Sequence, residues 1–307
     1  MRLSRWGQSP YETDEDMVLE RRALEAHVEV CPWGVDAEIV VVHSKVPMGR
    51  IEHMRAPSLR LVLTTTSGTD HIDLDHFRNE GVVIARLPEA RRDAVVDTTV
   101  GALIWGLRRI GVLRQRADEG TWARAELPAL APVGLRGARV GIVGMGIIGS
   151  KVAEVLMVMG ASVCGIDPSG LPQGVSASSL EWMLAQCDAL SLHCDLNPTT
   201  HGLLDAETLK QAHRDLVLVN TARGALLDAN VAIEMACAGK LGAVALDVFP
   251  VEPWGSMDAG VEASNVLLMP HAAGYHRGLA RAVRDGLVRA VVAFVDGHAV
   301  PHTVQGA

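Results

Sequence analysis

The stretch VGIVGMGIIGS, residues 140–150, constrains the fold more than any other part of the chain. An apolar, strand-like run leads directly into Gly144-Met-Gly146-Ile-Ile-Gly149, and a helix-like segment follows. In such a unit the first glycine permits a tight turn, the second lets the backbone approach a pyrophosphate, and the third allows close helix–strand packing. The free N–H groups at the helix N-terminus would bind the anion. The pattern predicts a dinucleotide-binding site.

A carboxylate follows at a suitable spacing. The next strand-like run ends in Asp167, 18 residues beyond Gly149, close to the spacing of a carboxylate that binds the adenosine ribose hydroxyls. Its charge would repel a 2′-phosphate and no arginine follows it directly, so NAD is favoured over NADP. A tight turn with a helix-capping aspartate is the alternative interpretation. The cofactor-binding residues predicted in this region are Gly144, Gly146, Ile147, Ile148, Gly149 and Asp167.

Elsewhere the chain alternates short apolar runs with helix-like segments. Continuous apolar runs separated by helices are typical of parallel sheets covered on both faces. We therefore predict an α/β fold with two Rossmann-like, doubly wound parallel-sheet domains. The expected strands are 37–44, 59–65 and 81–87 in an early group, and 138–144, 161–167, 189–194, 215–221, 242–248 and 265–271 in a later one.

Two long amphipathic segments, about 93–118 and about 277–296, interrupt this series and are expected to be linking helices. They divide the chain into a segmented first domain and a continuous second one. The first, flavodoxin-like substrate domain is predicted to comprise residues 1–97 plus 276–307. The second, a Rossmann domain that binds NAD, is predicted to comprise residues 98–275.

Composition narrows the class of protein. The 307 residues carry a net charge of −8, which argues against a nucleic-acid or anionic-membrane partner because both would be repelled. The start lacks the apolar core of a signal peptide, and no apolar run has the length of a membrane span. The five cysteines contain no CxxC pair, as expected for reduced thiols in the cytoplasm. The 12 histidines are scattered, so no metal is predicted.

Three of the later strand ends carry unusual side chains. Arg223 follows the run 215–221, Glu252 follows 242–248, and His271 ends 265–271. A guanidinium suits a substrate carboxylate, and a histidine can exchange a proton with a carbonyl or hydroxyl oxygen. A carboxylate beside the histidine would orient its ring and favour the imidazolium. Each residue alone has an ordinary explanation as a loop residue, but their occurrence together favours a catalytic set.

The sequence resembles the D-isomer-specific 2-hydroxyacid dehydrogenases over nearly its whole length. The motifs VGIVGMGIIGSKVA, NTARGALLD, ALDVFPVEP and NVLLMPHAAG stand in the family's order and spacing, as do TSGTDHID, GTW and VPHTV. The resemblance implies hydride transfer between NAD(H) and a small 2-keto or 2-hydroxy acid. It implies catalytic roles for Arg223, Glu252 and His271, cofactor contacts at Thr99, Thr221, Ala222, Arg223, Asp247 and His271, and substrate contacts at Ser67, Gly68, Arg223 and His271.

Several features of the sequence allow more than one interpretation. An NADH-sensing binding protein of the corepressor type is the alternative function, because residues 93–109 resemble the corresponding corepressor segment. The family forms homodimers, and the apolar segment 101–107 is the expected contact. Arg86, Arg91 and Arg92 form either a solvated loop or a binding site for a second anionic group of the substrate. Trp254 is either a pocket or interface residue or a surface anchor; the two are left open.

Overall fold

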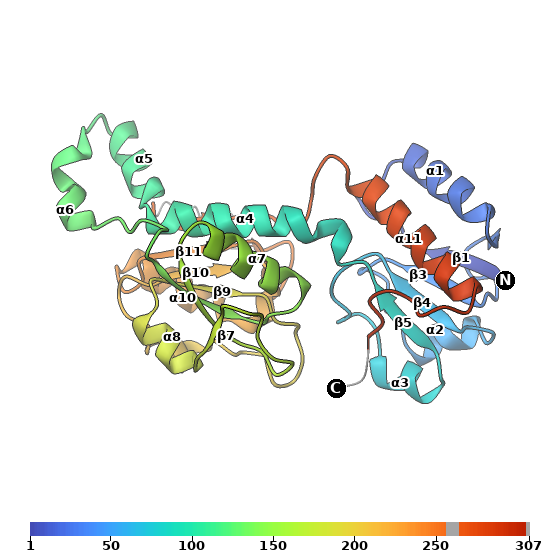
Figure 1. Ribbon diagram of the computed structural model, residues 1–307. Coiled ribbons are helices and arrows are strands. Elements are labelled where there is room, and N and C mark those ends of the chain that lie inside the picture. The colour runs from blue at the N-terminus through green and yellow to red at the C-terminus, as the bar shows by residue number, and fades with distance from the viewer. Residues whose placement is uncertain (256–263, 305–307) are drawn as a thin grey trace. The chain divides into compact units, whose positions relative to one another are not determined.

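The computed structural model describes residues 1–255 and 264–304, and it divides into two compact units (Figure 1). The first unit comprises Met1–Arg92 and the segment from Tyr275 onward, and the second comprises Asp93–Gly274. The strands of each sheet pair in parallel. The α/β class is thereby confirmed. The boundary expected at 97/98 falls within helix α4 (Glu89–Leu107), which begins in the first unit and continues in the second.

The first unit has a five-stranded sheet in the order β2-β1-β3-β4-β5, the flavodoxin-like order. The first two strands were not expected from the sequence, because arginines at positions 2 and 5 hide the apolar pattern of β1 and because β2 has only three residues. The elements are β1 (Arg2–Trp6), α1 (Asp14–Glu25), β2 (Glu29–Cys31), β3 (Ile39–Val42), α2 (Arg50–Arg55), β4 (Leu61–Thr64), α3 (Leu74–Asn79), β5 (Val83–Arg86) and α11 (Leu279–Val295).

The second unit has a seven-stranded sheet in the order β12-β11-β10-β9-β6-β7-β8. The direction of winding reverses between β6 and β9, which is where doubly wound sheets bind ligands at the carboxyl ends of their strands. Besides α4, the elements are α5 (Ile110–Asp118), η1 (Ala123–Glu126), α6 (Leu127–Leu130), β6 (Arg139–Val143), α7 (Ile147–Val158), β7 (Ser162–Ile166), β8 (Ser176–Ala177), α8 (Leu180–Gln186), β9 (Ala189–Leu192), α9 (Ala206–Leu209), β10 (Val217–Asn220), η2 (Gly224–Leu226), α10 (Ala229–Cys237), β11 (Ala243–Leu246) and β12 (Val266–Leu268).

Both faces of the larger sheet are buried. Along β10, Val217 and Val219 pack into one hydrophobic cluster, whereas Leu218, together with Leu216 just before the strand, packs into another. Successive side chains of a strand point to opposite faces, so the two clusters lie on opposite sides of the sheet. Burial on both faces is the physical reason why these strands read as continuous apolar runs.

The first linking segment is two helices rather than one. Arg109 lies between α4 and α5 with a positive φ of 56°, and its side chain contacts the carbonyl of Leu130 and the carboxylate of Asp215, both at 3.4 Å. Within the segment 101–107, Ala102, Leu103 and Leu107 are buried in the core of their own unit, and Ile104 and Trp105 are partly buried. A dimer contact at this segment stays a prediction. Within the described residues, no helix has the length and apolar character of a membrane span.

Candidate functional site

The three side chains singled out in the sequence lie at one edge of the second sheet. Arg223 follows β10, Glu252 follows β11, and His271 follows β12. These three strands are neighbours and run parallel, so their carboxyl ends share an edge. The arrangement explains how residues distant in sequence come to one side of a single sheet.

His271 and Glu252 contact each other directly. The Nδ1 atom of His271 lies 2.8 Å from Oε2 of Glu252, while Oε1 accepts a hydrogen bond from the Phe249 N–H at 3.1 Å. The carboxylate therefore fixes both the orientation of the imidazole and the proton on Nδ1. The His271 side chain is 51% exposed, and among the described residues none bonds to Nε2. Nε2 is thus available to exchange a proton with a bound molecule.

Asp247 holds the backbone that carries His271. Its carboxylate is buried and accepts the N–H groups of Ala272 at 2.8 Å and Ala273 at 2.9 Å. The N–H of His271 donates to the Asp247 carbonyl at 2.7 Å, and His271 itself has a positive φ of 54°. These three bonds support a left-handed conformation that is unfavourable for a residue with a side chain. A contact from Asp247 to the cofactor stays a prediction.

Arg223 is placed by a clamp that the sequence alone did not reveal. The buried Asn220 accepts the N–H of Ala222 at 3.0 Å and donates to the carbonyl of Arg223 at 2.9 Å. Next to it, a side chain at Gly224 would collide with the backbone of Phe249. The turn that carries Arg223 therefore packs closely against the segment leading to Glu252. The available signal was an asparagine at the end of a buried strand, three residues before Arg223.

The glycine-rich loop lies at the switch point between β6 and β9. Gly144 has a φ of 92°, and a Cβ there would collide with the backbone of Cys194. A Cβ on Gly149 would collide with the Gly144 carbonyl oxygen, whereas a Cβ on Gly146 would meet nothing within 4 Å. The first and third glycines are thus required by the protein's own packing. The second leaves open space at the N-terminus of α7, as a bound pyrophosphate needs.

Asp167, which directly follows β7, binds the glycine-rich loop through its carboxylate. Its Oδ2 accepts the Met145 N–H at 2.6 Å and its Oδ1 accepts the Ser169 N–H at 2.7 Å. The carboxylate is therefore held beside the glycine-rich turn. Ile147 and Ile148, in the first turn of α7, are partly buried. The residues present fit a dinucleotide with free ribose hydroxyls.

Thr99 and Thr221 meet within the same unit. Their hydroxyl oxygens are 2.9 Å apart and both residues are buried. Thr99 lies on α4, and Thr221 immediately follows β10, next to the partly buried Ala222. The two threonines predicted to line the cofactor are therefore in contact, and Thr221 lies two residues before Arg223.

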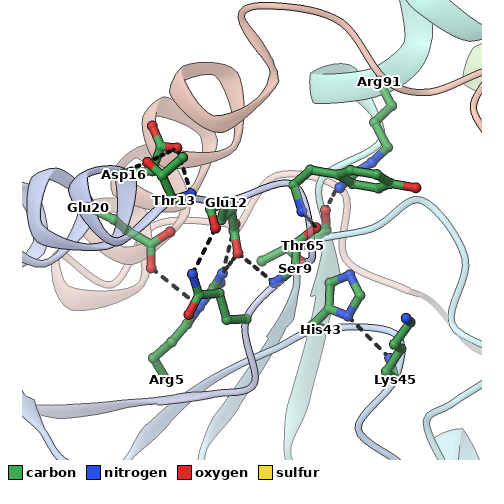
Figure 2. A network of polar contacts seen from close by, with 12 residues as sticks. Arg5, Ser9, Glu12, Thr13, Asp16, Glu20, His43, Lys45, Thr65 and Arg91 are labelled. Carbon is green, nitrogen blue, oxygen red and sulfur yellow. Dashed lines mark hydrogen bonds and ion pairs between the residues drawn. The ribbon is translucent and has the colours of Figure 1, made fainter.

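In the first unit, the loop that follows β4 is braced by arginines. Arg86 donates to the Ser67 carbonyl at 3.0 Å, Arg91 donates to the Thr65 carbonyl (Figure 2), and the Thr66 hydroxyl donates to the Gly68 carbonyl at 3.0 Å. Burial lowers the pKa of Arg91 below its usual value. The interpretation as a solvated loop residue is therefore wrong for Arg91, while Arg86 is the partly buried last residue of β5.

Trp254 packs on the protein itself. Its ring stacks on Phe249 at a centroid distance of 4.5 Å and an interplanar angle of 9°. The stacked pair anchors the short segment that contains Glu252. Among the described residues, no group of three or more histidine, cysteine or acidic side chains could hold a metal ion.

A doubly wound sheet with a glycine-rich loop at its switch point and a histidine–carboxylate pair at the same edge defines the class of NAD-dependent oxidoreductases. The family model described as "D-isomer specific 2-hydroxyacid dehydrogenase, NAD binding domain" matches residues 100–273. This chain belongs to the D-isomer-specific 2-hydroxyacid dehydrogenase family, and its cofactor is NAD.

Known relatives agree with this assignment. Glyoxylate reductase of Thermococcus litoralis is 28% identical over 280 residues, which cover 88% of this chain and 84% of that protein. Glyoxylate reductase 1 of Saccharomyces cerevisiae is 33% identical over 238 residues, which cover 75% and 67%. The structure of D-lactate dehydrogenase from Aquifex aeolicus, complexed with NAD and lactic acid, has a TM-score of 0.81 over 100% of both chains at 23% identity. That last likeness shows the shared fold.

Proposed function

We propose that this enzyme reduces a short 2-keto acid of the glyoxylate or hydroxypyruvate type to the 2-hydroxy acid with NADH, and catalyses the reverse oxidation with NAD. The observation that carries the proposal is the 2.8 Å contact between His271 Nδ1 and Glu252 Oε2. It occurs at the sheet edge that also carries Arg223 and the glycine-rich loop. The relatives named above are reductases and dehydrogenases, which supports turnover rather than the sensing alternative.

His271, Glu252 and Arg223 have separate roles in the proposed reaction. When bound, NADH supplies the hydride that reaches the carbonyl carbon. His271, as imidazolium, donates a proton from Nε2 to the carbonyl oxygen, and Glu252 stabilises that imidazolium and keeps the ring in place. Arg223 pairs with the substrate carboxylate, for which its planar fork is suited. In the oxidative direction neutral His271 accepts the proton from the hydroxyl group.

Further residues would bind the two ligands. Backbone N–H groups of Ser67 and Gly68 are proposed to hold the substrate carboxylate. The Asp167 carboxylate is proposed to bind the adenosine ribose hydroxyls and to repel a 2′-phosphate. The remaining proposed cofactor contacts are Gly144, Gly146, Ile147, Ile148, Gly149, Thr99, Thr221, Ala222 and Asp247.

Turnover on a panel of keto acids tests the function. Glyoxylate, hydroxypyruvate, pyruvate, phenylpyruvate and 2-ketoglutarate are each offered with NADH, and oxidation is followed by nicotinamide absorbance. We expect at least one short keto acid to turn over, and His271→Asn to lower kcat by about 10³-fold. Tight NADH binding without turnover on any acid would reject the proposal. Faster turnover with NADPH than with NADH would reject the role of Asp167.

We further propose a cytoplasmic homodimer. The five cysteines are free thiols, as expected in a reducing compartment. Large apolar side chains are exposed beyond α4, with Ile110 at 44% and Trp122 at 86%, and they suit a contact with a second copy. Light scattering at micromolar concentration tests the dimer, and Trp122→Glu is expected to shift it towards monomer. A wild-type monomer would contradict the proposal.

A further inference from the structure

Two buried thiols lie together in the second unit, close in sequence to the cofactor loop. Cys164 is the third residue of β7, and Cys187 is the C-cap residue that directly follows α8. Their sulfur atoms are 3.6 Å apart. A disulfide requires about 2.05 Å between the sulfurs and a Cβ separation near 3.8 Å. Side-chain rotation together with a small shift of β7 or α8 would bring the sulfurs into bonding distance.

We propose that Cys164 and Cys187 form an oxidation site, which a peroxide converts to a disulfide and which thereby weakens NADH binding. The part of this proposal that concerns the cofactor rests on the NAD site proposed above. The thiol chemistry stands on the pair's own geometry.

Cys164 is the sulfur that reacts first. It is 7% exposed, whereas Cys187 is fully buried. Hydrogen bonds from Cys187 and Ser178 lower the pKa of the Cys164 thiol to about 7, and the same pairing raises the pKa of Cys187 above its usual value. The thiolate is the reactive form of cysteine, so Cys164 is both the more accessible and the more nucleophilic partner.

The reaction balances with peroxide as the oxidant. The Cys164 thiolate attacks one peroxide oxygen, the O–O bond breaks, and after proton transfer a sulfenic acid and water result. The Cys187 sulfur then attacks the sulfenic sulfur, the S–O bond breaks, and a second water leaves with the Cys187 proton. Two thiols lose two electrons and two protons in total, and the peroxide is reduced to two waters.

The link to the cofactor runs along β7. Asp167 lies three residues after Cys164 and holds the Met145 N–H in the glycine-rich loop at 2.6 Å. On the other side, Cys187 is held through its carbonyl by His213 Nε2 at 2.6 Å. This bond restrains the C-terminal end of α8, so the part of the roughly 1.5 Å approach that side-chain rotation does not supply falls on β7. The Asp167 carboxylate would then move away from its place beside the loop.

Neighbouring thiols provide matched controls. Cys194 is partly buried in the same core, and burial raises its pKa to about 11. Cys237, on α10, is exposed. Neither has another cysteine as a hydrogen-bond partner among the described contacts. Cys237→Ser therefore removes a thiol without removing the pair, whereas Cys187→Ala leaves Cys164 without its partner sulfur.

The full-length protein is treated with stoichiometric hydrogen peroxide, the remaining thiols are alkylated, and the intact mass is measured. We expect the loss of two alkylation sites and of about 2 Da before alkylation, reversed by dithiothreitol. Cleavage after Glu181 separates the two cysteines, so the linked peptides identify the bond. The Cys237→Ser variant should behave like wild type, and Cys187→Ala should give no intramolecular link at Cys164.

NADH affinity is measured by fluorescence on the reduced and oxidised protein. We expect the Kd to rise by about threefold or more on oxidation and to recover on reduction. An absent Cys164–Cys187 link, or a link that leaves the Kd unchanged, would overturn the proposal. If the reduced protein fails to bind NADH, the proposed NAD site is wrong. The mass measurement still tests whether Cys164 and Cys187 form a disulfide.

Discussion

At the scale of single residues, the site depends on side chains that each satisfy two partners. The two oxygens of Glu252 contact His271 and the Phe249 N–H, and the two oxygens of Asp247 contact two consecutive backbone N–H groups. Because both oxygens of each carboxylate are hydrogen-bonded, neither side chain can rotate without losing a hydrogen bond, and each holds its partners in one orientation. The geometry therefore assigns Glu252 to the ring of His271 and Asp247 to its backbone.

Glu252→Gln tests the charge at this pair. The amide oxygen can still accept from His271, but it cannot stabilise the imidazolium, so we expect kcat to fall by about 10²–10³-fold with a much smaller change in KM. Steady-state kinetics over a range of pH measures the effect. Val251→Ala, at an exposed neighbouring position, is the control and should leave kcat unchanged. An equal loss in both variants would point to damage of the loop.

Arg223→Lys tests the substrate anchor. Lysine keeps the charge but loses the planar fork that binds a carboxylate through two hydrogen bonds, so we expect kcat/KM to fall by about tenfold to 100-fold. NADH affinity, measured by fluorescence, should change much less. Arg214→Lys, at an exposed position before β10, is the control. A normal kcat/KM in Arg223→Lys would remove the arginine from the site.

At the scale of elements, the three glycines of the turn between β6 and α7 meet different structural requirements. Gly144 and Gly149 are required because their added side chains would strike backbone, while Gly146 faces open space at the N-terminus of α7. Close packing of strand and helix and access for an anion are thus separate requirements. The spacing of the three glycines satisfies both requirements.

Alanine substitutions separate these two requirements. Gly146→Ala should fold normally, with an unchanged melting temperature, but raise the Kd for NADH by about tenfold or more because the methyl group enters the space for the pyrophosphate. Gly149→Ala should lower the melting temperature, because its methyl group collides with the Gly144 carbonyl. Calorimetry and fluorescence titration give the two readouts. Equal melting temperatures with normal NADH affinity in both variants would contradict the assignment.

At the scale of the whole molecule, two parallel sheets use the carboxyl ends of their strands differently. In the second unit these ends carry the glycine-rich loop and the histidine–carboxylate pair. In the first unit, beside β1, they carry a buried charge network (Figure 2). Arg5 binds both oxygens of Glu12, at 2.9 and 2.8 Å, which leaves Glu20 at a longer 3.5 Å.

This network makes stability depend on pH. Burial raises the pKa of Glu20 to about 7, from 4.5; the charge of Arg5 offsets this effect only in part, and the charge of Glu12 raises the pKa further. The folded state therefore binds more protons than the unfolded state between these values. The contribution to stability is complete below about pH 4.5 and is lost as the pH rises through 7.

Glu20→Gln should remove this dependence. We expect the variant to match wild type near pH 5 and to exceed its free energy of unfolding by about 2–3 kcal/mol at pH 8. Urea unfolding of the two proteins at both pH values measures the difference. Glu25→Gln, at an exposed position of the same helix, should show no such change between the two pH values. A difference for Glu20→Gln that is equal at both pH values would contradict the pKa assignment.

The sequence by itself determined the α/β class, nearly all the long strands and the glycine-rich loop, because continuous apolar runs and a fixed glycine spacing are local patterns. It also indicated that Arg223, Glu252 and His271 stand at strand ends. It missed β1, whose charged Arg5 is buried only through the distant Glu12 and Glu20. The dimer contact expected at 101–107 stays a prediction.

Only the tertiary structure decided which of these groups touch. The 2.8 Å contact of His271 with Glu252, the contact of Thr99 with Thr221 and the pairing of Cys164 with Cys187 each join segments that the chain brings together by folding. Local sequence governs the conformation of a strand or a turn. Contacts between side chains depend on the register of neighbouring strands and on the packing of helices against them, and no local pattern encodes these distances.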